Sequence, residues 1–149
     1  MRELLLMIHP TVGVLGVLTA LWVFVEALNA SSHNRTRLWW GGVLTALMMI
    51  ATWIAGGYWY VTYYAADKAL ILEGPWPLAH TLVMETKEHV FFLTLTLALL
   101  LPLIVFKEDL AVNRGARILV LVVSALIVLS AFALEGAGAL ISMAVRVSM

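Results

Sequence analysis

Residues 4–28 read LLLMIHPTVGVLGVLTALWVFVEAL, and this apolar stretch decides the fold class. It is longer than the roughly 20 residues that an α-helix needs to cross a bilayer. It is also longer than the apolar part of a signal peptide, and no small-residue cleavage pattern interrupts it. We therefore expect a retained first membrane span, in which His9 and Glu26 are the ionisable residues.

Three more stretches of the same kind follow, so the expected spans are 4–28, 38–64, 78–106 and 116–145. The chain is 63% hydrophobic and 12% charged, against roughly 25% charged residues in a typical soluble domain. The sequence predicts an all-α membrane protein whose outer surface contacts lipid. We expect residues 1–149 to form a single domain, a bundle of four transmembrane helices.

Charge and cysteine content exclude several classes of function. The net charge of zero gives no support for a nucleic-acid partner. The chain has no cysteine, which removes disulfides, zinc–thiolate sites, iron–sulfur clusters and covalently attached haem. We find no catalytic nucleophile or phosphate-binding loop, so the sequence alone assigns no enzyme activity and leaves that question open.

Lys and Arg in the short loops predict the orientation, because cytoplasmic loops carry an excess of them. The first and third loops hold five: Arg35, Arg37, Lys107, Arg114 and Arg117. The opposite side holds four: Arg2, Lys68, Lys87 and Arg146. Since the five lie nearer the membrane ends, we expect both termini on the outward, periplasmic side. The expected location is a bacterial or archaeal plasma (inner) membrane.

Ionisable residues gather toward the outward end of the expected bundle. A rise of about 1.5 Å per residue places His9 and His89 one to two turns inside the outward boundary. Glu85 precedes His89 by one helical turn, and Glu135 lies somewhat deeper in the fourth span. Ionisable residues inside membrane spans are costly, so they constitute a functional-site hypothesis by default.

Glycines lie at the same level as these residues. Gly13 and Gly16 follow His9 on one helical face, and Gly56 and Gly57 lie at a similar depth in the second span. One interpretation is close helix packing, which small residues permit in membranes. The other is room for a flat cofactor against bare backbone.

The favoured hypothesis is a b-type haem between the first and third spans, with His9 and His89 as axial ligands. Its expected surroundings are Gly13, Gly16, Gly56, Gly57, Tyr60 at the edge and Lys87 beside the propionates. The protein would then be a small electron-transfer subunit. Its partners would be other membrane or periplasmic redox subunits, with a quinol or quinone as a further candidate. This build is similar to that of four-helix haem-b membrane anchors of respiratory enzymes, although no motif here identifies a family.

Two alternatives use the same residues. In the first, His9, His89, Glu85 and Glu135 hold non-haem iron, manganese or zinc, or handle protons. The stretch ETKEH, residues 85–89, misses the ExxH pattern of di-iron bundles by one residue. In the second, the histidines and acids only hold the bundle together, and the protein is a structural or assembly subunit.

The connection between the second and third spans, DKALILEGPWP at 67–77, is expected to lie in the interface and cap the site. His80 lies nearly opposite His89 on the third span. We interpret His80 as an interfacial residue, or as part of a second redox or quinone site.

Overall fold

The computed structural model describes residues 2–149, and of Arg2 the backbone alone. It contains α1 (Arg2–Leu28), α2 (Arg35–Glu73), α3 (Glu85–Lys107) and α4 (Arg114–Val147). A π-helical segment, η1 (Ala79–Met84), leads directly into α3. Four segments are long and apolar enough to cross a membrane, with η1 and α3 forming one of them. The all-α four-helix prediction is confirmed, and the protein is a multi-pass membrane protein by the length and composition of its helices.

The largest difference from the expected spans is in α2, which continues past residue 64 to Glu73. The predicted connection at 67–77 is therefore mostly helical. Its residues Ala66 to Leu72 are largely strong helix formers, and the charges of Asp67 and Lys68 do not interrupt a helix. The helix ends at Gly74, followed by Pro75, which leaves a short turn before η1.

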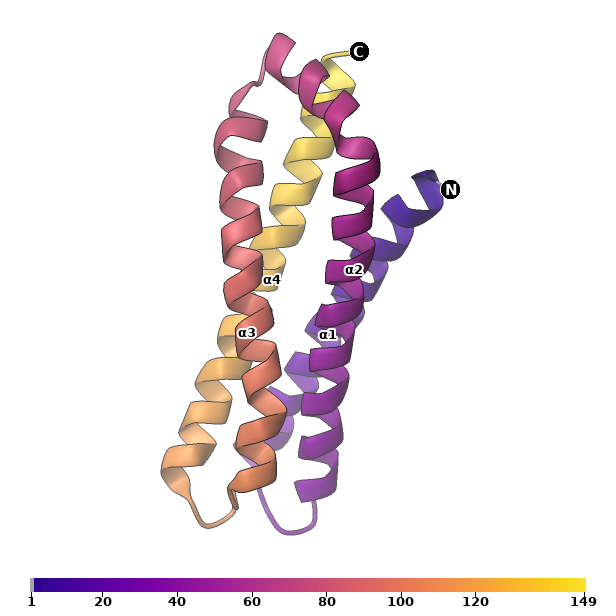
Figure 1. Ribbon diagram of the computed structural model, residues 1–149. Helices are drawn as coiled ribbons and strands as arrows, with labels where there is room; N and C mark the ends of the chain where they lie inside the picture. The colour runs from indigo at the N-terminus through magenta and orange to yellow at the C-terminus, as the bar shows by residue number, and fades with distance from the viewer. Residues whose placement is uncertain (1) are drawn as a thin grey trace.

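The helices run antiparallel, so that both termini and the α2–η1 turn share one end of the bundle (Figure 1). We call this the termini end, and the end with the other two connections the loop end. Each helix packs against its neighbours in the chain, and α4 closes the bundle against α1. Within residues 2–149, α1 and α3 make no contact and occupy opposite corners. The amino-terminal part of α1 leans away from the other helices (Figure 1).

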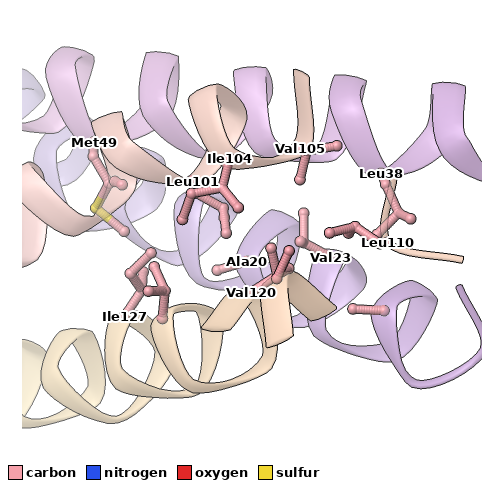
Figure 2. Packing of buried hydrophobic residues seen from close by; sticks show 14 of the residues in the cluster. Ala20, Val23, Leu38, Met49, Leu101, Ile104, Val105, Leu110, Val120 and Ile127 are labelled. Carbon is pink, nitrogen blue, oxygen red and sulfur yellow. The ribbon is translucent and has the colours of Figure 1, made fainter. Parts of the chain in front are cut away.

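The loop-end half contains a large, mainly apolar core (Figure 2). Fully buried members come from all four helices: Ala20, Val23, Leu38, Leu101, Val120 and Ile127. Gly42 brings α2 close to α3, because a Cβ at this position would lie 3.2 Å from the backbone Cα of Pro102. Large apolar side chains also cover the outside of the bundle, among them Leu18, Ile54, Leu99, Leu103 and Phe132. This outer surface suits contact with lipid.

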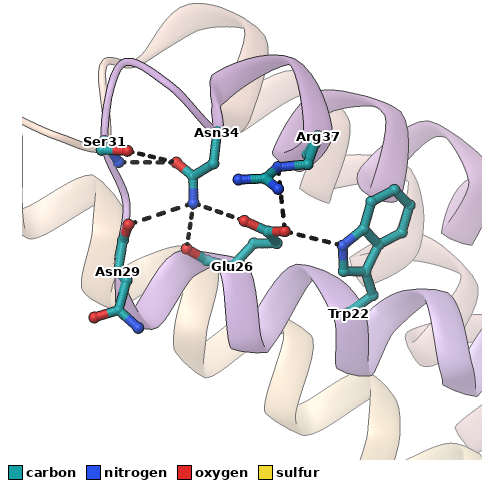
Figure 3. Close-up of polar contacts among 6 residues, drawn as sticks. All are labelled: Trp22, Glu26, Asn29, Ser31, Asn34 and Arg37. Atoms are coloured by element: carbon teal, nitrogen blue, oxygen red, sulfur yellow. Dashed lines mark hydrogen bonds and ion pairs between the residues drawn. The ribbon is translucent and has the colours of Figure 1, made fainter.

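A polar network joins α1 to α2 at the loop end (Figure 3). The Asn34 amide donates to the Glu26 carbonyl at 2.9 Å and to its carboxylate at 2.8 Å. Its side-chain oxygen accepts the Ser31 N–H at 2.8 Å. The Glu26 carboxylate also accepts from Trp22 at 3.2 Å and lies 3.4 Å from Arg37. The network satisfies the polar groups of the α1–α2 turn and fixes the angle between the two helices.

A second, smaller core lies at the termini end and joins α2, η1 and α4. Its buried residues are Tyr64, Ile71, Ala79, Met84, Ile141, Ala144 and Val145. Between the two cores lie three of the ionisable residues that the sequence singled out, His9, Lys87 and Glu135.

Candidate functional site: a polar layer contributed by four helices

His9 of α1 makes hydrogen bonds to Thr52 of α2 through both its backbone carbonyl and its imidazole ring. The buried Thr52 hydroxyl donates to the His9 carbonyl at 2.8 Å. The imidazole Nδ1 lies 2.9 Å from the Thr52 carbonyl and 2.9 Å from its hydroxyl oxygen. Because the hydroxyl proton is already donated, both oxygens act as acceptors toward Nδ1. The ring therefore carries its proton on Nδ1 and leaves Nε2 as a free base.

Gly56 makes room for this imidazole. A Cβ at Gly56 would lie 2.6 Å from His9 Cε1 and 2.7 Å from Nδ1. Real Cβ atoms do not approach so closely, so any larger residue would displace the ring. The glycine one turn after Thr52 and the hydrogen bonds of Thr52 together set the position of His9.

Glu135 of α4 reaches the same level across Gly13 of α1. A Cβ at Gly13 would lie 2.7 Å from Glu135 Oε1 and 3.5 Å from the Thr52 hydroxyl oxygen. The carboxylate and the Thr52 hydroxyl thus flank one glycine. Gly13 itself is buried, and Glu135 is half-buried.

Lys87 of α3 completes the layer. Its Nζ lies 3.0 Å from the place of a Cβ at Gly138, which follows Glu135 by one turn on α4. Lys87 is half-buried and approaches α4 about one turn from Glu135. Each of the four helices therefore contributes one polar side chain to a single layer: His9, Thr52, Lys87 and Glu135. We call this set the polar layer.

His89 is not part of the polar layer. The stripe of Glu85, His89, Phe92 and Thr96 exists as the sequence indicates, but all four residues are exposed. The inward face of α3 instead carries Thr94, Ala98 and Leu101. The His89 Nδ1 lies 2.7 Å from the Glu85 carbonyl of its own helix. The structure thus brings His9 and Glu135 to one level inside the bundle and places Glu85 and His89 on its surface.

The remaining predicted residues divide between packing and a second cluster. Gly16 packs against Met49, whose Cε would lie 2.9 Å from an added Cβ. Gly57 has no atom within 4 Å of an added Cβ. Tyr60 stacks on Tyr64 nearer the termini end, with ring centroids 5.0 Å apart. Gly13 and Gly56 are therefore the two predicted glycines that line the polar layer.

The sequence prediction misses Thr52, and it treats His80 as an interfacial residue or part of a second site without predicting its burial beside Tyr64. Thr52 shares a helical face with Met49 and Gly56, and this position indicates that it faces the bundle interior. A single threonine does not by itself indicate a functional site. His80 is 4% exposed and its Nδ1 lies 3.0 Å from the Tyr64 hydroxyl. The burial of His80 depends on η1, and no local sequence pattern predicts a π-helix.

In residues 2–149, no three histidine, aspartate or glutamate side chains come together in a way that could hold a metal ion. A scan against protein-family models and searches of curated proteins and of solved structures find nothing that matches this chain. The fold and the site therefore describe the class of protein: a four-helix membrane bundle with a polar layer between two apolar cores.

Proposed function

We propose that this protein takes up and releases protons at the polar layer, which is reached from the termini end of the bundle. The observation that carries the proposal is the placement of Glu135 and Lys87 at one level inside the bundle, against Gly13 and Gly138, beside the hydrogen-bonded pair of His9 and Thr52. Ionisable groups at such a position are costly to the fold. The presence of these ionisable side chains is explained if changes in their protonation are part of the protein's function.

The chemistry of the four side chains supports protons as the substrate. Glu135 and Lys87 can exist as an ion pair, or as a neutral pair after a single proton passes between them. His9 adds a free Nε2 that can accept a proton while Thr52 holds the ring in place. A metal-binding role for the same residues has less support, because the acids and histidines do not cluster.

The apolar core of the loop-end half supports access from one end. Between the polar layer and the loops lie apolar side chains that are each at most 2% exposed: Met49, Leu101, Val105, Val120 and Ile127. The buried hydroxyls of Thr45 and Ser124 in this half donate to carbonyls of their own helices, and the close-packed aliphatic side chains around them give a proton few partners. The protein is therefore proposed to bind protons from one side. A membrane or periplasmic partner would respond to the resulting change in the charge of the polar layer.

The orientation follows the loop charges. We propose that the termini end faces outward and the loop end faces the cytoplasm of a bacterial or archaeal cell. In this orientation the polar layer exchanges protons with the outside.

Infrared titration of the protein in lipid nanodiscs tests the proposal. We expect a carboxyl carbonyl band that changes with pH and disappears in Glu135→Gln. The band should shift in Lys87→Met, because the neighbouring charge is lost. Glu73→Gln, on the exposed end of α2, is the matched control and should leave the band in place. If no band depends on Glu135 at any pH at which the fold persists, the proposal is overturned.

A second candidate function is electron transfer through a b-type haem, and a specific observation favours it. The Nδ1 atoms of His9 and His89 both face backbone carbonyl oxygens, at 2.9 Å and 2.7 Å. This contact is typical of metal-ligating histidines, since it leaves Nε2 for the metal. His9 fits an axial ligand, whereas His89 lies on the outer surface of α3 and would require that helix to turn. Bound haem would supply reversible one-electron transfer to a quinol or a periplasmic redox partner.

A reduced-minus-oxidised visible spectrum of the purified protein tests this candidate. A b-type spectrum lost in both His9→Ala and His89→Ala would support ligation by two histidines. Loss in His9→Ala alone would support a haem held by His9 without His89. A flat spectrum in protein purified from haem-replete cells would remove the candidate.

A further inference from the structure

A second group of polar side chains lies between the polar layer and the termini end. Its centre is Tyr64, which is 2% exposed and whose hydroxyl lies 3.0 Å from His80 Nδ1. On the other side of the ring, His80 Nε2 lies 3.8 Å from Glu85 Oε1. The Glu85 side chain is 50% exposed, whereas that of His80 is 6% exposed. The three residues thus lead from the surface into the interior.

The backbone around His80 is unusual. Residues Ala79–Met84 form a π-helix, a conformation that is rare and is frequently found at functional sites. Here it carries the buried His80 at the entrance to α3. Since an ordinary α-helical turn would be less costly, the π-helix is best explained by the placement of this ring beside Tyr64.

The polar groups continue from Tyr64 toward the polar layer. Tyr64 stacks on Tyr60, and Glu88 of α3 lies near both phenols, with its carboxylate closest to the Tyr60 hydroxyl. Glu88 Oε1 is buried and has no hydrogen-bond partner. A buried acceptor without a partner is costly, and is expected where a proton or a water molecule is bound in passing. Glu88 is adjacent in the chain to Lys87, the α3 member of the polar layer.

We propose that Glu85, His80 and Tyr64 form the entrance through which protons reach the polar layer, with Glu88 as the next acceptor. The inference rests on the proton-handling function proposed above. A proton bound by Glu85 passes to His80 Nε2, and the Nδ1 proton of His80 passes to the Tyr64 oxygen. The Tyr64 hydroxyl proton leaves at the same time toward Glu88. Each intermediate group gains and loses one proton, and no electron moves.

Other titratable groups face this entrance. Asp67 of α2 acts on the Tyr64 phenol, and so do Glu85 and Glu88 of α3. The span of 3.8 Å between His80 and Glu85 exceeds a direct hydrogen bond, so the transfer there takes place through a small side-chain movement or a bridging water.

The test is the rate at which Glu135 changes protonation after a pH jump, followed by its infrared band in nanodiscs. Tyr64→Phe and His80→Phe keep the rings but remove the relay atoms. We expect both to slow the change by about 10²-fold, the usual size of a positioned proton donor's contribution, while the final amplitude is unchanged. Glu85→Gln, at the surface, should slow it as well without disturbing the core. Tyr58→Phe and His33→Phe are exposed controls of the same residue types and should match the unmodified chain.

The outcomes separate the two proposals. If Glu135 titrates at an unchanged rate in Tyr64→Phe, His80→Phe and Glu85→Gln, the entrance is refuted and the proton-handling function stands. If Glu135 gives no pH-dependent band in the unmodified protein, the function itself fails and the entrance fails with it. Should the two buried variants lose the fold, the rate in Glu85→Gln decides.

Discussion

At the scale of single residues, the identity of one atom decides what His9 can do. The Thr52 hydroxyl proton is donated to the His9 carbonyl, so Nδ1 must be the donor and Nε2 the base. A free Nε2 can accept a proton or ligate a metal, and both proposed functions start from it. The position of the ring depends in turn on Gly56, which has no side chain to displace it.

Gly56→Ala should therefore move His9, because the new Cβ would lie 2.6 Å from Cε1. We expect a loss of stability of about 1–3 kcal/mol, typical of overpacking, together with altered imidazole nitrogen NMR shifts. Gly57→Ala is the matched control, since an added Cβ there meets nothing within 4 Å. Thermal unfolding in detergent measures the difference. Equal stability and unchanged imidazole shifts in the two variants would refute this account of the site.

At the scale of helices, close approach depends on particular glycines. Gly42 lies against the backbone of Pro102, and backbone cannot move aside as the end of a flexible side chain can. Gly42→Ala should separate α2 from α3 and destabilise the protein by about 1–3 kcal/mol. Gly136→Ala, in an open position on α4, should be neutral or up to about 1 kcal/mol more stable. Unfolding by denaturant compares the two; a Gly42→Ala protein as stable as Gly136→Ala would contradict the packing.

The junction of α1 and α2 provides another test at this scale. Asn34 is 4% exposed and binds groups on both sides of the turn. Asn34→Ala leaves the Glu26 carbonyl and the Ser31 N–H without this partner, which should cost about 1–3 kcal/mol. Ser32→Ala, in the same turn but exposed, is the control. Comparable unfolding midpoints for the two variants would show that the network does not hold the junction.

At the scale of the whole molecule, the two ends of the bundle have different interiors. The interior of the loop-end half is mainly aliphatic, with the buried hydroxyls of Thr45 and Ser124, whereas the other half contains the polar layer, the Tyr64–His80 pair and the π-helix. This division makes orientation a functional question, because it decides which compartment the ionisable groups face.

The absence of cysteine from the chain allows the orientation to be measured directly. Single substitutions Met149→Cys and Ser32→Cys place one thiol at each end of the bundle, both at exposed positions. We expect an impermeant maleimide to label Met149→Cys in intact cells and Ser32→Cys only after permeabilisation. The physical reason is the excess of Lys and Arg in the loop-end connections. The opposite labelling pattern would place the polar layer toward the cytoplasm.

Four helices long and apolar enough to cross a membrane could be predicted from the sequence alone, because length and hydropathy are local properties. The sequence also singled out His9, Glu135, Gly13 and Gly56, which the structure brings to one level. What it did not determine is which face of each helix turns inward. Lipid is as apolar as leucine, so a membrane helix lacks the polar outer face that reveals orientation in soluble proteins.

Tertiary packing determines which face of α3 turns inward. The stripe through His89 was expected to face the bundle, yet it lies on the surface, while Lys87 and Thr94 turn inward. The partnership of His9 with Thr52 and that of Tyr64 with His80 join residues from different helices. No local pattern encodes such pairs, since they exist only after the helices have packed and η1 has rotated His80 into the interior.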